Sequence, residues 1–188
     1  MGSCVYVAVR PAGGEARRIG QNLIQALAEP MVGRAGLSRD DTGRPRVEGL
    51  AVSVSYSEHQ VAVAVGYDGP LGIDLEEVRP REFRALAQRW FGQRELDWMA
   101  EQPDELTGFL QLWTAKEAVG KALGTGLNDG GLQREMPLGG GPVEAAPGLA
   151  VTYLSCPNAV LALAAPADVT IEYMSIDHGN CPPGVTGA

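Results

Sequence analysis

Cysteine is scarce in this 188-residue sequence, and the three that occur, Cys4, Cys156 and Cys181, are far apart. No two of them have metal-ligand or redox spacing, so we expect free thiols, as in a reducing cytoplasm. Long apolar runs are also absent, since none approaches the ~18 residues that a bilayer-spanning helix needs. The N-terminus lacks the charged segment and apolar stretch of a signal peptide. We therefore expect a cytoplasmic protein that does not contact membranes.

Basic residues are outnumbered by acidic ones, and the formal net charge is -8. Non-specific nucleic-acid binding depends on many phosphate contacts from Lys and Arg, so we expect no nucleic-acid partner. Hydrophobic residues make up 45% of the chain and charged residues 20%, which indicates a globular protein rather than a disordered one. The length suits one compact unit or two small half-domains that share a core, and two tandem lobes would make a monomer sufficient.

Lysine is rare even among the basic residues. Of the 15 Lys and Arg residues only two are lysines, Lys116 and Lys121, and both lie in one short stretch. Chance clustering is one explanation. The alternative is that a site in this stretch needs a compact ammonium group, which the planar guanidinium of Arg cannot replace.

The first half of the chain has the pattern of a strand, a helix and then several strands. A strand is expected over 4–9, a helix over 15–28 and an irregular, Arg-rich stretch over 30–48. A three-strand meander is expected next, over residues 52–56, 61–65 and 71–76.

The second half is expected to begin with helices and to return to strands. The helices are predicted over 82–91, 94–100 and 105–123, the last of them ended by Gly124. After a loop-rich stretch, strands are predicted over 150–154, 160–164 and 169–173.

A weak internal repeat indicates two similar lobes. The segments VAVAV at 61–65 and VLALA at 160–164 occupy comparable places in the two halves. The fold class is therefore α+β, with two pseudo-symmetric α+β lobes. We place the N-terminal lobe at 1–78, the C-terminal lobe at 79–175 and a flexible tail at 176–188.

Two carboxylates stand out on the predicted strand over 71–76. Asp74 and Glu76 are two positions apart, so both side chains lie on one face of the strand, and Gly72 on that face would leave room for a ligand. Converging carboxylates repel each other unless a cation or proton lies between them, and a hard divalent ion is the natural occupant. The alternative is the polar side of an edge strand.

The long predicted helix carries a second group of polar residues. Trp113, Glu117 and Lys121 are spaced four positions apart and share one helix face. An exposed Glu–Lys pair at this spacing is common and contributes roughly 0.3–0.5 kcal/mol. That explanation accounts less well for the preceding Trp and for the confinement of lysine to this segment.

These residues fall within two segments that resemble a known family. LGIDLEEV at Leu71–Val78 and WTAKEAVGK at Trp113–Lys121 are similar, in order and spacing, to the two signatures of the 4′-phosphopantetheinyl transferases. The resemblance is closest to the larger type, which activates peptide and polyketide synthetases and includes the surfactin-synthetase activator. GRP at 43–45 and VSVSYSEHQVAVAV at 52–65 resemble further family segments, and the similarity runs from about Glu15 to Tyr173.

The resemblance implies an activity and a set of site residues. The enzyme would move 4′-phosphopantetheine from coenzyme A to a serine of an acyl or peptidyl carrier protein, and would depend on Mg²⁺. Asp74, Glu76 and Glu117 would be the magnesium ligands. Glu117 would also serve as the base, and Lys121 would contact the phosphates of coenzyme A. Further contacts with the nucleotide end would come from Arg18, Arg44, Ser55 and Tyr56. The site would lie between the two lobes.

The sequence departs from the family pattern at two places. The family has His where this chain has Tyr56, and Tyr cannot carry a positive charge near pH 7. The stretch between the first strand and the first helix is short, and arginines within 34–46 would have to replace its basic residues. Two alternatives therefore stay open: a non-catalytic relative that binds coenzyme A or carrier protein, and another Mg²⁺-dependent phosphotransferase. A Walker-type phosphate loop is absent from the sequence.

Overall fold

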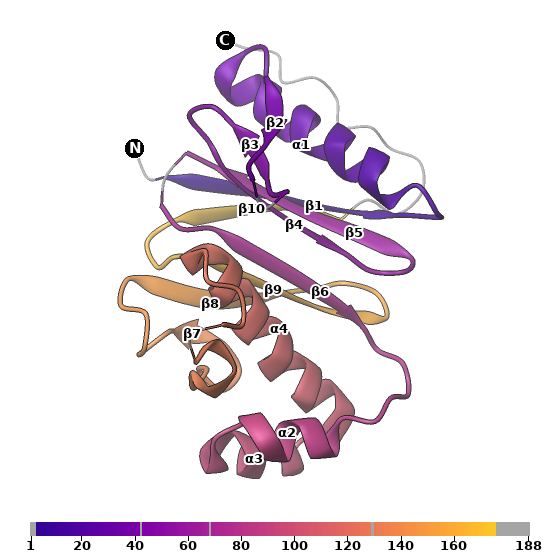
Figure 1. Cartoon of the computed structure of the whole chain (residues 1–188), viewed down its shortest axis with the longest axis vertical. Coiled ribbons are helices and arrows are strands. Elements are labelled where there is room, and N and C mark those ends of the chain that lie inside the picture. The colour runs from indigo at the N-terminus through magenta and orange to yellow at the C-terminus, as the bar shows by residue number, and fades with distance from the viewer. Residues whose placement is uncertain (1–2, 42, 68, 129, 176–188) are drawn as a thin grey trace.

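The computed structural model describes residues 3–41, 43–67, 69–128 and 130–175. Two four-stranded sheets lie against each other, and each is covered on its outer side by a long helix (Figure 1). This mixed arrangement confirms the predicted α+β class. The tail predicted at 176–188, including Cys181, lies outside the described residues.

The first sheet has the strand order β10-β1-β5-β4 and carries α1 on its outer face. Strand β1 is parallel to β10, whereas the other neighbours are antiparallel. A two-stranded hairpin, β2 with β3, precedes β4. The elements are β1 (Cys4–Pro11), α1 (Ala16–Val32), β2 (Leu37–Arg39), β3 (Pro45–Val47), β4 (Ala51–Tyr56), β5 (Gln60–Gly66) and β10 (Thr170–Ser175).

The second sheet has the strand order β6-β9-β8-β7, is antiparallel throughout and carries α4 on its outer face. Two short helices, α2 and α3, lie at the far end of α4, at the bottom of Figure 1. The elements are β6 (Gly72–Glu77), α2 (Arg84–Trp90), α3 (Gln93–Ala100), α4 (Glu105–Leu123), the short 3₁₀ turn Gly131–Gln133, β7 (Gly141–Pro142), β8 (Leu149–Leu154) and β9 (Ala159–Pro166).

The alternation of side chains along the strands produces three apolar layers, one under each long helix and one between the sheets. Odd and even positions of a strand point to opposite faces, so each sheet contributes one row to the outer helix and another to its partner sheet. The layer between the sheets contains Val5, Val7, Val9, Ala62, Ala64, Ile73, Leu75, Leu161, Leu163 and Ala165. Asp74 and Glu76 therefore face away from this layer, toward α4.

Strand β6 departs from the meander that the sequence suggested. The hairpin of β4 and β5 forms as predicted, but β6 pairs with β9 in the other sheet. The last strand, β10, returns to pair with β1. These non-local pairings correct the expected three-strand meander. The division at residues 78 and 79 stays a prediction, although strands of both sheets come from both sides of it.

The repeat has a structural counterpart. Strand β5 holds VAVAV and lies between β1 and β4, whereas β9 holds VLALA and lies between β6 and β8. In each half a strand is followed by at least one helix and a hairpin, and the last strand pairs with the first. No helix in the described part of the chain is both long and apolar enough to cross a membrane.

Candidate active site

Helix α4 and strand β6 place the predicted site residues opposite each other. Asp104 caps the start of α4 by accepting hydrogen bonds from Leu106 N and Thr107 N, and Gly124 ends it in the left-handed conformation at φ 76°. These are the helix bounds that the sequence predicts. They set Glu117 and Lys121 on the side of α4 that faces β6.

Gly72 lets α4 and β6 approach closely. A Cβ atom at this position would lie 1.9 Å from Ala118 O and 2.7 Å from Ala122 N, both in the backbone of α4. The expectation that Gly72 leaves room for a ligand is therefore wrong, because the helix backbone occupies that space. The close contact instead brings Asp74, two residues further along β6, within reach of the helix.

Asp74 is the centre of the polar cluster. Its side chain is buried, with 6% of the residue exposed. Its Oδ1 accepts hydrogen bonds from Lys121 Nζ at 2.7 Å and Ser55 Oγ at 2.9 Å. Its Oδ2 is also buried but has no hydrogen-bond partner among the described residues. A buried carboxylate oxygen without a partner is unfavourable, and a cation would satisfy it.

Glu117 and Glu76 contribute the other two carboxylates. Burial raises the pKa of Glu117, and the negative charge of Asp74 raises it further, whereas Lys121 lowers it. The ionised form of Glu117 would therefore be stabilised by a nearby cation. Glu76 is partly exposed and accepts a hydrogen bond from Arg81 at 2.8 Å. The donor set is made of hard oxygen atoms, which fits Mg²⁺.

A different acidic group is the most tightly clustered in the described part of the chain. One ligand atom each from Glu58, His59 and Glu77 lies within 4.8 Å of the others. These atoms are already paired, because Glu77 accepts from Ser57 Oγ at 2.6 Å and from His59 N at 2.7 Å. Glu58 forms an ion pair with Arg79. We interpret this group as a junction between the sheets. Asp74, Glu76 and Glu117 are not so close together, and their metal site stays a prediction.

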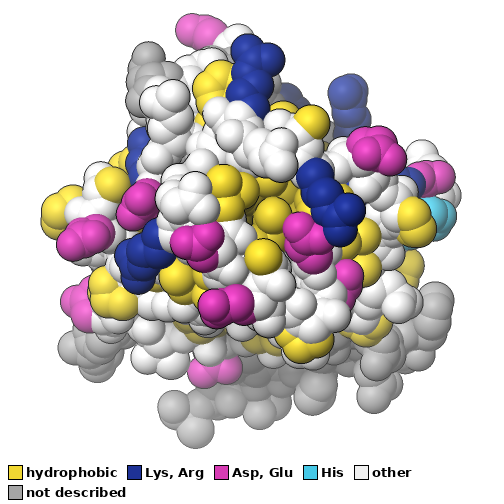
Figure 2. Space-filling model, turned by 90° about the horizontal axis from the view of Figure 1, so that it is seen from below, with side chains coloured by type: hydrophobic (Ala, Val, Ile, Leu, Met, Phe, Trp, Pro, Cys, Tyr) yellow, Lys and Arg dark blue, Asp and Glu magenta, His cyan; other side chains and the backbone are white. Residues whose placement is uncertain are grey.

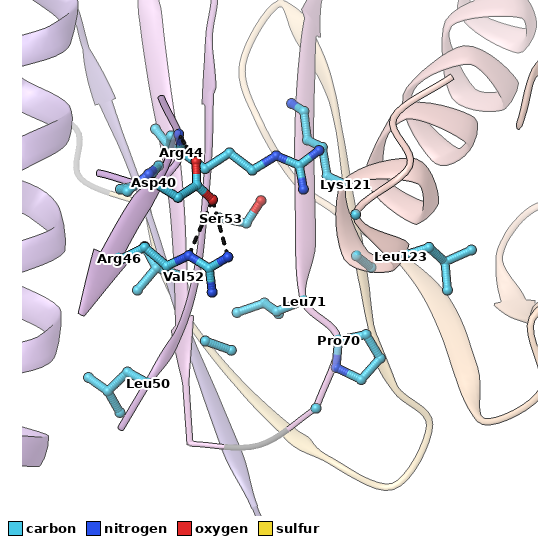
Figure 3. Close-up of a pocket in the computed structure, with 16 residues that line it drawn as sticks. Asp40, Arg44, Arg46, Leu50, Val52, Ser53, Pro70, Leu71, Lys121 and Leu123 are labelled. Carbon is cyan, nitrogen blue, oxygen red and sulfur yellow. Dashed lines mark hydrogen bonds and ion pairs between the residues drawn. The ribbon is translucent and has the colours of Figure 1, made fainter. Parts of the chain in front are cut away.

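A pocket of about 350 Å³ lies next to the cluster of Asp74, Glu117 and Lys121. It is lined by the β2–β3 hairpin, β4, residues 69–71 and the end of α4. Arg44 extends across it toward Lys121, and Arg46 is held by Asp40 at 3.1 Å (Figure 3). Lys121 belongs to both the pocket and the acidic cluster. The pocket therefore combines apolar walls with cationic groups, as a phosphorylated ligand would require.

The remaining predicted site residues are distributed unevenly. Arg44 lines the pocket, but Arg18 does not; it pairs with Glu15 on the exposed start of α1. Tyr56 is 38% exposed. A Cβ atom on Gly20 would lie 2.9 Å from its hydroxyl oxygen, so its ring packs on α1. Ser55 points to the other side of β4, toward Asp74.

Sequence reasoning missed two polar contacts, one beside the site and one in the core. Ser53 Oγ accepts a hydrogen bond from Ile73 N at 3.0 Å, and this contact depends on the position of β6 beside β4. Lys116 is fully buried and pairs with Glu95 at 2.7 Å. The alternation of Ser53 and Ser55 along β4 is a visible signal, whereas nothing local in the sequence points to the partner of Lys116.

Comparison with known proteins supports the family resemblance. Residues 70–136 match the model of the 4′-phosphopantetheinyl transferase superfamily. This segment contains β6, α4 and the whole acidic cluster, and together with the fold it supports membership of that superfamily.

Curated proteins that resemble this chain carry the same family name. The chain is 40% identical over 82 residues to 4′-phosphopantetheinyl transferase HetI of Nostoc sp., covering 42% of this chain and 35% of the relative. It is 33% identical over 104 residues to 4′-phosphopantetheinyl transferase AcpT of Salmonella typhi, covering 54% and 52%. A 4′-phosphopantetheinyl transferase of Bacillus subtilis is 34% identical over 119 residues, covering 58% and 52%. The chain thus spans between a third and about half the length of these relatives.

Proposed function

We propose that this chain transfers the 4′-phosphopantetheine group of coenzyme A to a serine of an apo acyl or peptidyl carrier protein. The products would be the holo-carrier protein and adenosine 3′,5′-bisphosphate, and the reaction would depend on Mg²⁺. This is the activity of a holo-acyl-carrier-protein synthase. The printed names of the relatives support the transferase class.

One observation carries the proposal. The buried, partnerless Oδ2 of Asp74 lies in a cluster with Glu117, and Lys121 connects that cluster to a pocket containing Arg44. A metal-assisted transfer from a pyrophosphate needs carboxylates for the metal beside cations for the phosphates. Both kinds of group meet at this point of the molecule.

The residues suggest a division of roles. Asp74, Glu76 and Glu117 would hold the ion, which when bound supplies positive charge to the pyrophosphate of coenzyme A. Lys121 and Arg44 would bind phosphate oxygens. Glu117 would accept the proton of the carrier serine, directly or through water, as that serine attacks the phosphorus atom. Tyr56 and Arg18 would serve the nucleotide only if the ligand extends toward α1.

We assign the chain to the larger, surfactin-synthetase-activator type. Support comes from the Gly43–Pro45 segment, which reaches the pocket through Arg44 and Pro45, and from the two β-α-hairpin halves within one chain. Because both halves are present in one chain, we propose that a monomer is sufficient. We also propose that the protein works in the cytoplasm, in keeping with its few, widely separated cysteines.

The decisive experiment is incubation with coenzyme A, Mg²⁺ and a panel of apo-carrier proteins, followed by intact-mass measurement. We expect the carrier to gain the mass of one phosphopantetheine group. Asp74→Asn should abolish the gain, because the amide cannot supply the charge that an ion requires. Thermal protection by coenzyme A without any mass gain would instead support a non-catalytic binding module. Protection by ATP but not by coenzyme A would support another phosphotransferase.

A further inference from the structure

Two edge strands from different sheets meet beside the site. Strand β4 is an edge strand of the first sheet, and β6 is an edge strand of the second. They lie side by side without a backbone ladder between them. An open strand edge leaves N–H groups without partners, and buried ones must be satisfied in some other way.

Serine hydroxyls of β4 satisfy the open edge of β6. Ser53 Oγ accepts a hydrogen bond from Ile73 N at 3.0 Å, and Ser55 Oγ accepts one from Leu75 N at 3.2 Å. Both serines are buried, at 7% and 5% exposure. The two hydroxyls therefore hold β6 in a fixed position relative to β4, on either side of Asp74.

Ser55 makes one further contact that Ser53 does not. Its hydroxyl donates to Asp74 Oδ1 at 2.9 Å while it accepts from Leu75 N. A serine hydroxyl has a single proton, and that proton is used on Asp74. Ser55 is thus left with no proton to donate to a nucleotide phosphate. The expectation that it binds the nucleotide end of coenzyme A does not fit this geometry.

We propose that Ser55 is a positioning residue for Asp74 rather than a ligand of coenzyme A. Together with Lys121, it directs two hydrogen bonds to Oδ1 and so prevents rotation of the carboxylate. Oδ2 is then the oxygen presented to the metal, in agreement with its lack of a partner. Partners that orient a ligating carboxylate commonly change metal affinity when they are removed. This inference rests on the metal site of the proposed function.

Ser53 provides a matched control. Ser53→Ala and Ser55→Ala each remove one buried hydroxyl from the same face of β4, and each leaves one N–H of β6 without an acceptor. The two variants should therefore lose similar stability. Only Ser55→Ala also removes a hydrogen bond to Asp74 Oδ1. Ser55→Thr keeps the hydroxyl and tests whether that group is the cause.

The experiment titrates Mn²⁺ into each purified variant, with and without coenzyme A, and follows the free ion by electron paramagnetic resonance. We expect Ser55→Ala to weaken Mn²⁺ binding by about 10- to 100-fold, and Ser53→Ala to leave it unchanged. Ser55→Thr should recover most of the affinity. The KM for coenzyme A should stay the same in Ser55→Ala, while the Mg²⁺ concentration for half-maximal transfer rises.

The outcomes separate this inference from the proposed function. A raised KM for coenzyme A with unchanged Mn²⁺ binding in Ser55→Ala would overturn the inference, because the hydroxyl would then act on the nucleotide. Equal weakening of Mn²⁺ binding in Ser53→Ala would also overturn it, as a general effect of strand damage. If Ser55→Ala alone weakens Mn²⁺ binding but the wild-type chain transfers nothing from coenzyme A, the inference holds and the proposed function fails.

Discussion

Lys116 and Lys121 have different roles although both lie on α4. Lys121 Nζ contacts Asp74 Oδ1 and Ile73 O on the side of β6 and is partly exposed. Lys116 is fully buried, pairs with Glu95 and donates to Arg134 O. Its ammonium also lies 4.9 Å from the centroid of the Phe91 ring. The two lysines thus lie in two separate environments, one beside the candidate site and one in the core.

Lys116 should be essential for stability rather than for chemistry. Loss of one member of a buried ion pair leaves the other charge unpaired, and typically costs about 3–5 kcal/mol. We expect Lys116→Met to lose about this much free energy of unfolding in urea. The double variant with Glu95→Gln should recover part of the loss, because a neutral amide can still accept from Met136 N. A loss no larger than that of a surface pair, about 1 kcal/mol or less, would contradict this role.

Lys121→Met is the complementary variant. It should lose transfer while losing less stability than Lys116→Met, because its side chain is 27% exposed.

At the residue scale, the sequence could predict which acidic side chains share a face, but not the contacts around them. Strand and helix periodicity set Asp74 beside Glu76, and Glu117 beside Lys121, because those spacings are local. The role of Ser55 depends on the strand that lies next to β4, and local pattern does not determine that. The family resemblance puts Tyr56 where the family has His, but its ring lies on the α1 side of β4.

At the scale of elements, α4 and β6 show where sequence reasoning succeeds and where it fails. The bounds of α4 follow from a cap and a terminating glycine, which are signals within the helix itself. The pairing of β6 with β9 joins residues nearly ninety positions apart, for example Asp74 with Ala162. Nothing in the alternation of β6 distinguishes that partner from the nearer β5. The hairpin of β2 and β3 was missed for a different reason, since each strand has only three residues.

The contact between α4 and β6 should not tolerate a methyl group at Gly72. Gly72→Ala would place Cβ 1.9 Å from Ala118 O, so the helix or the strand must shift. We expect the free energy of unfolding to fall by about 1–3 kcal/mol or more. Transfer activity should fall by a larger fraction, because Asp74 moves with β6. Gly36→Ala is the control, since nothing lies within 4 Å of its Cβ position. Equal melting temperatures for the two variants would show that α4 and β6 leave room for a methyl group at position 72.

The junction between β6 and the β4–β5 turn should make stability depend on pH. Burial alone would raise the pKa of Glu77, but hydrogen bonds from Ser57 and His59 outweigh it and lower the pKa from 4.5 to about 2. The same contact raises the pKa of His59 above 6.5. Glu77 therefore stabilises the fold above its unfolded pKa, and this contribution is lost as pH falls toward about 2. The His59 contribution is complete below 6.5 and is lost as pH rises through its raised pKa.

Glu77→Gln should thus lower the melting temperature most between pH 4.5 and 6.5, where both partners are charged. The difference from wild type should shrink on either side of that window, as differential scanning fluorimetry across pH would reveal. Glu58→Gln should have little effect at any pH, because its pair with Arg79 is exposed on both sides. A pH-independent loss in Glu77→Gln would mean that packing, not charge, makes the contribution.

At the scale of the whole molecule, the site lies where the two sheets meet, and α2 and α3 form the end opposite to α1 (Figure 1). Large apolar residues of α2, of α3 and of the link between them divide between the interior and the surface. Phe91 and Met99 belong to the core, whereas Leu86 is 37% exposed. Figure 2 views the molecule from this end, where hydrophobic, basic and acidic side chains alternate over the surface.

The exposed arginines of this end should serve carrier-protein docking if the proposed function holds. Arg84 is paired with Glu105, whereas Arg89 lies over the Trp90 ring, 5.0 Å from its centroid, with its side chain exposed. An acidic carrier helix would be attracted by exposed cations such as Arg89, because opposite charges speed encounter. We expect Arg89→Glu to raise the KM for carrier protein and to leave the KM for coenzyme A unchanged.

The control for Arg89→Glu is Arg17→Glu, which makes the same charge change on the exposed surface of α1, at the other end of the molecule. Both variants lower the net charge equally, so a long-range effect of total charge would appear in both. A docking contact would appear only in Arg89→Glu, and it should weaken as salt is added, because exposed charges are screened over about 10 Å at 0.1 M. Equal rises in the KM for carrier protein would remove the α2–α3 surface from the docking site. A rise in the KM for coenzyme A as well would indicate that Arg89 supports α2 through Trp90, and that its loss disturbs the site through the fold.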